Sequence, residues 1–139
     1  MRTIADIMTR SIATVQRDET LQAAARRMQE MDVGSLPVLD GRAVAGMVTD
    51  RDIAVRGVAA GMIPQESLIA DVMTEELRFC RAGDSGEVVM AEMGDLQVRR
   101  LPVLDANNEI VGIVALADIA TRQSTHTDET LREISTPGR

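Results

Sequence analysis

Gly46-Met47-Val48-Thr49-Asp50-Arg51-Asp52-Ile53 is the stretch that decides how this chain folds. An apolar run that is typical of a strand ends at Val48, and apolar residues at helical spacing begin at Ile53. Thr49 and Asp52 therefore lie where a strand passes into a helix. Their spacing is that of a capping box, in which each side chain accepts a hydrogen bond from the backbone N–H of the other residue. The first N–H groups of a helix also attract anions, so the stretch is a candidate ligand site as well.

Much of the chain is an internal repeat, and the quoted stretch belongs to it. Residues 4–9 (Ile-Ala-Asp-Ile-Met-Thr) return as residues 69–74 (Ile-Ala-Asp-Val-Met-Thr), 65 positions later. Residues 36–40 (Leu-Pro-Val-Leu-Asp) return unchanged at 101–105, with the same spacing. A fixed spacing over long segments indicates internal duplication. The second copies of Gly46, Asp52, Ile53 and Arg56 are Gly112, Asp118, Ile119 and Arg122, 66 positions later, because one residue is inserted near Asn107.

Hydrophobic periodicity predicts the same order of elements in both repeats: strand, helix, strand, strand, helix. Thr20 and Ser85 are the expected N-caps of the first helices. Gly34 is expected to end the first helix in a left-handed conformation, and Asp40-Gly41 is typical of a hairpin turn. The predicted strands are 13–15, 35–39 and 43–48, then 78–80, 100–104 and 110–115, and the second helices begin near Asp50 and Leu116. The predicted apolar face of the first helix comprises Leu21, Ala24, Ala25, Met28 and Met31.

The composition is that of a small acidic globular protein. The chain has 139 residues, 45% of them hydrophobic, and a formal net charge of −7. Because the charge is negative and only 1% of the residues are aromatic, we do not expect nucleic-acid binding. Cys80 is the single cysteine, which fits a reducing compartment. No apolar run approaches the roughly 18 residues of a membrane span, and the N-terminus has no apolar signal segment, so we expect a cytoplasmic protein without membrane contact.

These repeated motifs resemble the cystathionine-β-synthase (CBS) domain, present here as a tandem pair over about residues 3–122. The chain is similar to bacterial pairs that stand alone rather than beside an enzyme, channel or transporter. The resemblance implies an α/β (α+β) fold in which two β-α-β-β-α CBS repeats pack with pseudo-two-fold symmetry. The predicted division is repeat one at 1–62, a linker at 63–67, repeat two at 68–123, and a polar C-terminal tail at 124–139 that is interpreted as partly disordered or as a dimer-swapping arm.

Members of this family often bind adenosine-containing ligands in clefts between the repeats. The resemblance therefore implies AMP, ADP, ATP, S-adenosylmethionine or NAD as a regulatory ligand, with no required cofactor. In the family pattern the residue at Asp52 holds the ribose hydroxyls, and the residue at Thr49 lies near ribose or phosphate. Arg51 is either a phosphate contact or a solvated arginine of the first helical turn. Repeat two keeps Asp118 but has Ala115 in place of the threonine, so we expect one strong site and a weak or empty second.

Basic and apolar side chains complete the predicted ligand site. Arg99 and Arg100 stand just before the second Leu-Pro-Val and are candidates either for phosphate binding or for a surface strand entry balanced by nearby acidic residues. Adenine would have to lie between aliphatic side chains, because Phe79 is the only aromatic residue. The apolar candidates are Ile12, Val15, Leu36, Pro37 and Val38 in one half and Leu77, Cys80, Leu101, Pro102 and Val103 in the other, with ordinary core packing as the alternative.

The residue types do not indicate catalysis or metal binding. Cys80 is interpreted as a small buried hydrophobe, and His126 lies alone in the tail, so the two form neither a metal cluster nor a nucleophile–base pair. The sequence also contains no glycine-rich phosphate loop of the P-loop kind. We therefore expect a regulatory, ligand-sensing module rather than an enzyme. The alternative is a dimer scaffold for protein–protein interaction without a physiological nucleotide.

The helix that follows the quoted stretch predicts a homodimer. Its apolar residues cover more of the circumference than one core-facing stripe requires. An exposed remainder would form an apolar patch that two copies of the chain can bury under a two-fold axis. The alternative is that the linker or the tail covers the patch within one chain, and an unidentified regulated protein is a further expected partner. The apolar residues in question are Ile53, Ala54, Val55, Val58, Ala59 and Ala60.

Overall fold

The computed structural model describes residues 2–124, and its contacts divide the chain into two compact units. The continuous unit is Ala13–Arg78. The split unit joins the segment that ends at Ile12 to the segment that starts at Phe79. His126 and all but the first residue of the predicted tail lie outside the described residues.

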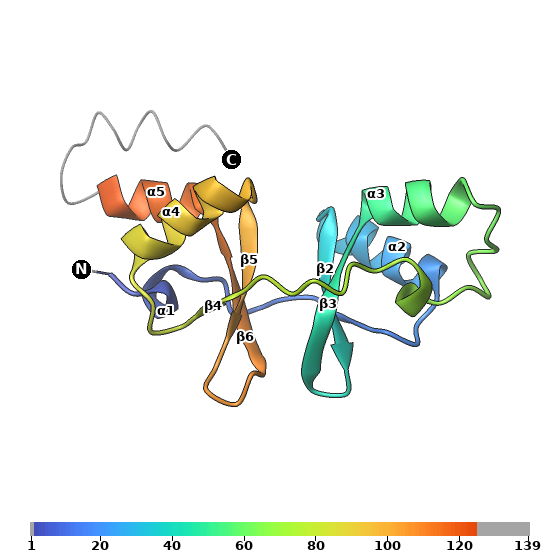
Figure 1. Ribbon diagram of the computed structural model, residues 1–139, viewed down its shortest axis with the longest axis horizontal. Helices are drawn as coiled ribbons and strands as arrows, with labels where there is room; N and C mark the ends of the chain where they lie inside the picture. The colour runs from blue at the N-terminus through green and yellow to red at the C-terminus, as the bar shows by residue number, and fades with distance from the viewer. Residues whose placement is uncertain (1, 125–139) are drawn as a thin grey trace. The chain divides into compact units, whose positions relative to one another are not determined.

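The continuous unit is a three-stranded sheet with two helices packed against it (Figure 1). The strand order is β1-β2-β3, with β1 parallel to β2 and β2 antiparallel to β3. The expected order of elements is confirmed, although the first strand begins two residues later than predicted. In chain order the elements are β1 Val15–Gln16, α2 Leu21–Met31, β2 Ser35–Asp40, β3 Ala43–Thr49, α3 Asp50–Asp52, the π-helix η1 Ile53–Val58 and the 3-10 helix η2 Ile69–Asp71.

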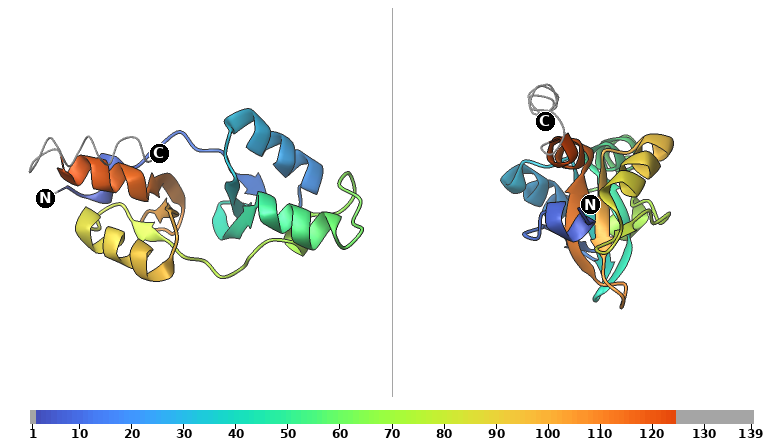
Figure 2. Two further views of the ribbon diagram at one scale, coloured as in Figure 1. Left: turned by 90° about the horizontal axis from the view of Figure 1, so that it is seen from above. Right: turned by 90° about the vertical axis from the view of Figure 1, so that its left-hand side faces the viewer.

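The split unit repeats this architecture with the strand order β4-β5-β6 and the same parallel and antiparallel pairings. Its helices α4 and α5 lie side by side against the sheet (Figure 2). The mixed α+β fold with β-α-β-β-α order in each repeat is therefore confirmed. In chain order the elements are α1 Ile4–Ile7, β4 Cys80–Arg81, α4 Gly86–Leu96, β5 Arg100–Leu104, β6 Ile110–Ala115 and α5 Leu116–Ser124.

The two copies of the Ile-Ala-Asp segment are exchanged between the repeats. Ile4 is buried in the core of the split unit, which contains the body of the second repeat. Ile69 is buried in the core of the continuous unit, which contains the body of the first. Equivalent backbone bonds fix both copies: the N–H of Ile4 donates to Asp84 O, and the N–H of Ile69 donates to Glu19 O, both at 2.9 Å. A sequence repeat and a compact unit are thus different divisions of this chain.

The predicted helix caps form, but the helix α2 ends differently from the prediction. Thr20 accepts a hydrogen bond from the N–H of Ala23, and Ser85 accepts one from the N–H of Val88, so both N-caps are confirmed. The expectation that Gly34 provides the left-handed residue is wrong, because Asp32 takes this conformation with a φ of 55°. Aspartate tolerates a left-handed backbone because its short polar side chain bonds locally.

The apolar face that α2 buries is narrower than the predicted one. Leu21, Ala24 and Met28 are buried in the core, as predicted. Ala25 and Met31 are exposed, so their assignment to the core-facing stripe is wrong. The buried residues follow the i, i+3, i+7 spacing of one helical face, and a single stripe of this width suffices to cover a short sheet.

Gly46 and Gly112 allow a segment of backbone to cross a strand. A Cβ atom on Gly46 would lie 2.2 Å from the carbonyl oxygen of Thr74, and one on Gly112 would lie 2.8 Å from that of Thr9. The crossing is fixed by backbone bonds on both sides, between Met47 and Thr74 and between Thr9 and Ile113. Glycine is the residue that permits such a close approach of two backbones.

Candidate functional site

The turn from β3 to α3 forms the predicted capping box. The N–H of Asp52 donates to Thr49 Oγ1, and the N–H of Thr49 donates to Asp52 Oδ2, both at 3.0 Å. Thr49 is the N-cap of α3 in extended conformation, which lets its hydroxyl face the first helical turn. The capping interpretation of these two residues is therefore confirmed. The box uses only one carboxylate oxygen of Asp52.

The second carboxylate oxygen of Asp52 faces Arg56 one helical turn later. The distance from Arg56 Nε to Asp52 Oδ1 is 3.9 Å. The Asp52 side chain is only 15% exposed, whereas that of Arg56 is 55% exposed. Arg51, the predicted phosphate contact, is exposed at the start of the same helix. The turn thus presents one oriented, largely buried carboxylate with an exposed arginine on either side of it in the sequence.

The corresponding turn in the split unit has the same backbone and different side chains. The N–H of Leu116 donates to Arg99 O at 2.8 Å, as the N–H of Asp50 donates to Gly34 O at 2.9 Å. Ala115 ends β6 without a hydroxyl, so no capping box is possible there. Asp118 is half-buried in the first turn of α5.

The two turns therefore carry opposite charge at their edges. At the first turn, Asp50 Oδ2 lies 3.2 Å from the place where a Cβ on Gly34 would stand. At the second, the equivalent positions hold Leu116 and Arg99, followed by Arg100, and both arginines are exposed. The second turn thus has two adjacent cations, Arg99 and Arg100, where the first turn has Gly34 and Ser35.

The apolar candidates lie mainly inside the two units. Val15, Leu36 and Val38 are core residues of the continuous unit, and Cys80, Leu101 and Val103 are core residues of the split unit. For these six side chains the structure favours core packing, the alternative that the sequence left open. Pro37 and Pro102 are also buried, and each lies in the sequence between two of these core residues. Ile12 and Leu77 are half-buried, and the exchange places each of them in the unit opposite to its repeat.

The Cys80 thiol is buried and has low reactivity. Burial raises the pKa of the Cys80 thiol to about 12, and the carboxylates of Asp84 and Glu92 add to the effect. The thiol donates weakly to the carbonyl oxygen of Pro102 at 3.9 Å. A thiol with so high a pKa is neutral at pH 7 and is a poor nucleophile. The interpretation of Cys80 as a small buried hydrophobe is confirmed.

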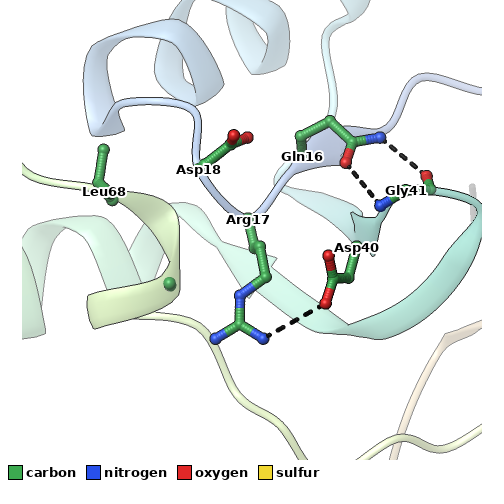
Figure 3. Close-up of a pocket in the computed structure, with 7 residues that line it drawn as sticks. Gln16, Arg17, Asp18, Asp40, Gly41 and Leu68 are labelled. Carbon is green, nitrogen blue, oxygen red and sulfur yellow. Dashed lines mark hydrogen bonds and ion pairs between the residues drawn. The ribbon is translucent and has the colours of Figure 1, made fainter.

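A polar cavity of about 380 Å³, which no motif in the sequence indicates, lies at the hairpin end of the continuous unit (Figure 3). The side-chain amide of Gln16 exchanges two hydrogen bonds with the backbone of Gly41, and Arg17 Nη1 lies 3.9 Å from Asp40 Oδ2. These contacts anchor the hairpin turn. Since Ser35 pairs with Thr49 at the other end of the hairpin, the cavity is separate from the capping-box turn.

A second, apolar cavity of about 310 Å³ lies between α2 and η1. Val58 of η1 lines this cavity and is 61% exposed, and Val55 of the same helix is 51% exposed. The sequence indicated this surface through the excess of apolar residues on the helix. The lining residues are Ala25, Met28, Gln29, Val33, Asp50, Ile53, Ala54 and Val58.

The described part of the chain contains neither a metal-binding cluster of side chains nor a membrane-spanning helix. Among residues 2–124, no three histidine, cysteine, aspartate or glutamate side chains come together as they would around a metal ion. In the same range no helix combines the length and the apolar character that crossing a membrane requires.

Comparison with known proteins identifies the repeats. The family model of the CBS domain matches residues 4–57 and 69–124. The CBS domain-containing protein YhcV of Bacillus subtilis is 42% identical over 123 residues, which are 88% of this chain and 86% of YhcV. Hypoxic response protein 1 of Mycobacterium tuberculosis is 39% identical over 127 residues, which are 91% of this chain and 88% of that protein.

Solved structures agree with the fold. A crystal structure of Hypoxic Response Protein I with two coordinated zinc ions matches with a TM-score of 0.77 and 39% identity, over 88% of this chain and 99% of that one. CBSX2 of Arabidopsis thaliana, solved in complex with AMP, also matches with a TM-score of 0.77, over 92% of this chain and all of that one. Because CBSX2 is only 22% identical, its likeness concerns the fold alone.

Proposed function

The chain belongs to the CBS domain family, as its repeated motifs predicted, and we propose that it is a regulatory module that binds an adenosine-containing nucleotide. The proposed site is the turn from β3 to α3 in the continuous unit, with Thr49 and Asp52 as its central residues. The observation that carries this proposal is the geometry of Asp52: the capping box fixes the carboxylate through Oδ2 and leaves Oδ1 outside the box. The ligand class proposed here is that of the AMP with which CBSX2, a protein of the same fold, is solved in complex.

The chemistry of a ribose suits this arrangement. A ribose offers two neighbouring hydroxyl donors, and the oriented carboxylate of Asp52 is an acceptor that pays little conformational entropy on binding. A hydrogen bond to a charged group contributes about 1.5–3 kcal/mol. Thr49 Oγ1, which already accepts the N–H of Asp52, still has a hydroxyl proton to donate to a ribose or phosphate oxygen.

The turns of the two repeats are expected to bind the ligand with different affinity. Arg51, Arg99 and Arg100 are the proposed phosphate contacts. Asp118 is the ribose acceptor of a second, weaker site, because Ala115 removes the hydroxyl and the capping box that would orient it. We therefore expect one strong site per chain, occupied by AMP, ADP, ATP, S-adenosylmethionine or NAD.

The test is isothermal calorimetry with these five compounds on the wild type and on Asp52→Asn. An asparagine keeps an oxygen for the N–H of Thr49, so the cap survives while the charge is lost. We expect the affinity of the best ligand to fall about 10- to 100-fold, from the loss of one charge-assisted bond. Asp6→Asn is the matched control, because Asp6 forms the same kind of capping box with Thr3 in α1. Equal affinity of wild type and Asp52→Asn would remove Asp52 from the site.

A second candidate function is a dimer scaffold without a physiological nucleotide. The exposed side chains of Val55 and Val58 favour it, because two neighbouring large apolar residues on one helix are costly to leave in water. The apolar cavity between α2 and η1 borders the same surface. In both functions the protein regulates rather than catalyses, and we place it in the cytoplasm as a homodimer.

A further inference from the structure

Arg56 connects the proposed ligand carboxylate to a distant segment of the chain. On one side its Nε lies 3.9 Å from Asp52 Oδ1. On the other side its Nη1 donates to the carbonyl oxygens of Val72, at 3.3 Å, and Met73, at 3.4 Å. A single guanidinium thus spans a largely buried carboxylate and two backbone carbonyls that are 16 and 17 residues away in the sequence.

The two carbonyls begin the segment by which the chain leaves the continuous unit. We call residues 72–78 the exit segment, because the unit ends at Arg78. The N–H of Met73 donates to Ile69 O at 2.9 Å, and the N–H of Thr74 donates to Met47 O at 2.8 Å. Residues 75–78 belong to no helix or strand. Arg56 therefore holds the exit segment immediately before its attachment to β3.

Packing fixes the helix that carries Arg56. This helix, η1, has π-helical geometry, whereas the equivalent helix α5 of the other repeat is a regular α-helix. Short π-helical segments occur frequently at functional sites. Gly57 is buried, and a Cβ on it would lie 2.9 Å from Leu21 Cδ1, so η1 approaches α2 as closely as a glycine allows. The backbone below Arg56 is thus held in place while its side chain remains accessible.

We propose that Arg56 is a coupling residue, which orients the carboxylate of Asp52 and transmits its occupation to the exit segment. The inference rests on the proposed function, since it concerns the same carboxylate. A ligand hydroxyl that donates to Asp52 Oδ1 competes with the guanidinium for this oxygen. Without that partner the exposed Arg56 side chain gains conformational freedom and spends less time on the carbonyls of Val72 and Met73. Binding at the turn therefore loosens the exit segment.

The charged groups close to Arg56 make this competition specific to Asp52. Among the described residues, Asp52 is the carboxylate within ion-pair distance of Arg56, and the other partners are the two neutral carbonyls. Glu75 and Glu76 follow in the exit segment; Glu76 pairs with Arg78 at 2.6 Å. A change at Asp52 therefore alters the main electrostatic partner of Arg56.

The experiment measures amide hydrogen exchange of Met73 and Thr74 by NMR in the full chain without ligand. Arg56→Met should accelerate exchange at both amides about 3- to 10-fold, the effect of losing weak, half-exposed hydrogen bonds. Asp52→Asn should accelerate it similarly, because Arg56 loses its anchor while the cap is kept. The double variant should be no faster than the faster single variant, since both changes break one chain of contacts. Arg26→Met, the same substitution at an exposed position of α2, is the matched control.

Three outcomes would overturn the proposal. The first is unchanged exchange at Met73 and Thr74 in Arg56→Met. The second is a double variant in which the two single effects multiply. The third is equal acceleration of the β2 and β3 amides, which would indicate general loss of stability rather than local coupling.

Addition of AMP separates this proposal from the proposed function. If calorimetry shows that AMP binds the wild type, exchange at Met73 and Thr74 should accelerate on binding, and Arg56→Met should bind AMP without this response. A response of equal size in Arg56→Met would contradict the coupling role. If AMP and the other four compounds do not bind the wild type, the proposed function fails, while the measurements without ligand still decide whether Arg56 couples Asp52 to the exit segment.

Discussion

Replacing Gly46 with alanine should destabilise the continuous unit through a contact that is made far away in the sequence. The new Cβ would stand 2.2 Å from the carbonyl oxygen of Thr74 and 2.8 Å from the Cε of Met73. The methionine tip can move aside, but the carbonyl belongs to backbone that is bonded to β3. The crossing segment must therefore retreat by more than 1 Å, about the shortfall from ordinary van der Waals contact.

The retreat costs two hydrogen bonds and adds strain. Met47 and Thr74 exchange two backbone bonds, at 3.0 and 2.8 Å, and each contributes about 0.5–1.5 kcal/mol. Overpacking of a tight site costs about 1–3 kcal/mol. Together the free energy of unfolding should fall by about 2–6 kcal/mol, a large part of the stability of a small domain. Gly112→Ala should cost less, about 1–3 kcal/mol, because the Cβ would lie 2.8 Å from Thr9 O and otherwise meets the flexible Met8 side chain.

The assay is equilibrium urea unfolding followed by far-ultraviolet circular dichroism, since the chain has no tryptophan or tyrosine for fluorescence. Gly94→Ala is the matched control, because Gly94 lies in α4 with open space around it. This control should stabilise the protein by about 0.5–1 kcal/mol through helix propensity. A Gly46→Ala variant with a free energy of unfolding within about 0.5 kcal/mol of wild type would refute the crossing argument.

Three further predictions concern charge and assembly. Arg27 donates a hydrogen bond to Glu19 that holds the pKa of this carboxyl below its ordinary value, so the pair stabilises the fold above the ordinary pKa and the gain, about 1 kcal/mol, is lost as pH falls through the lowered pKa. Urea unfolding at pH 7 and pH 3 should show this pH dependence reduced in Glu19→Gln. Neutralising Arg99 and Arg100 to glutamine should weaken AMP binding about 10-fold and adenosine binding little, as measured by calorimetry, whereas equal losses would exclude a phosphate contact. Val58→Glu should give a folded monomer by light scattering, and a monomeric wild type at tens of micromolar (roughly the range in which a modest interface holds) would exclude the homodimer.

The sequence predicted the elements of each repeat because their signals are local. Thr20 and Ser85 are N-caps at helix starts, and Thr49 and Asp52 form a capping box within one helical turn. Residues that are close in the sequence therefore contain the information that predicts these elements. The left-handed end of α2 was misplaced to Gly34 because glycine is the usual residue there, whereas Asp32 meets the same need with a side chain that bonds locally.

The exchange of the Ile-Ala-Asp segments could not be predicted from the repeat itself. A period of 65 residues shows that two segments are equivalent, but it does not show which of the two cores each copy joins. Ile4 and Ile69 are both buried among apolar side chains, so residue type does not distinguish the two cores. Which core each copy joins depends on the path of the chain between them. The same limit applies to Arg56, because its contact with Val72 and Met73 exists only through this exchange.

Comparison of equivalent positions in the two repeats distinguishes residues that the fold requires from residues that it does not require. Gly46 and Gly112 both stand under a crossing backbone, so the crossing alone accounts for glycine at each position. Thr49 has no such counterpart, because Ala115 ends β6, and α5 still begins with the equivalent backbone bond, from Leu116 to the residue that precedes β5. The hydroxyl and the capping box are therefore dispensable for making a helix at this place in the fold. The hydroxyl that the second repeat lacks, at a turn whose carboxylate keeps one oxygen outside the cap, is therefore not required by the fold, and this supports the proposal that Thr49 and Asp52 bind a ligand.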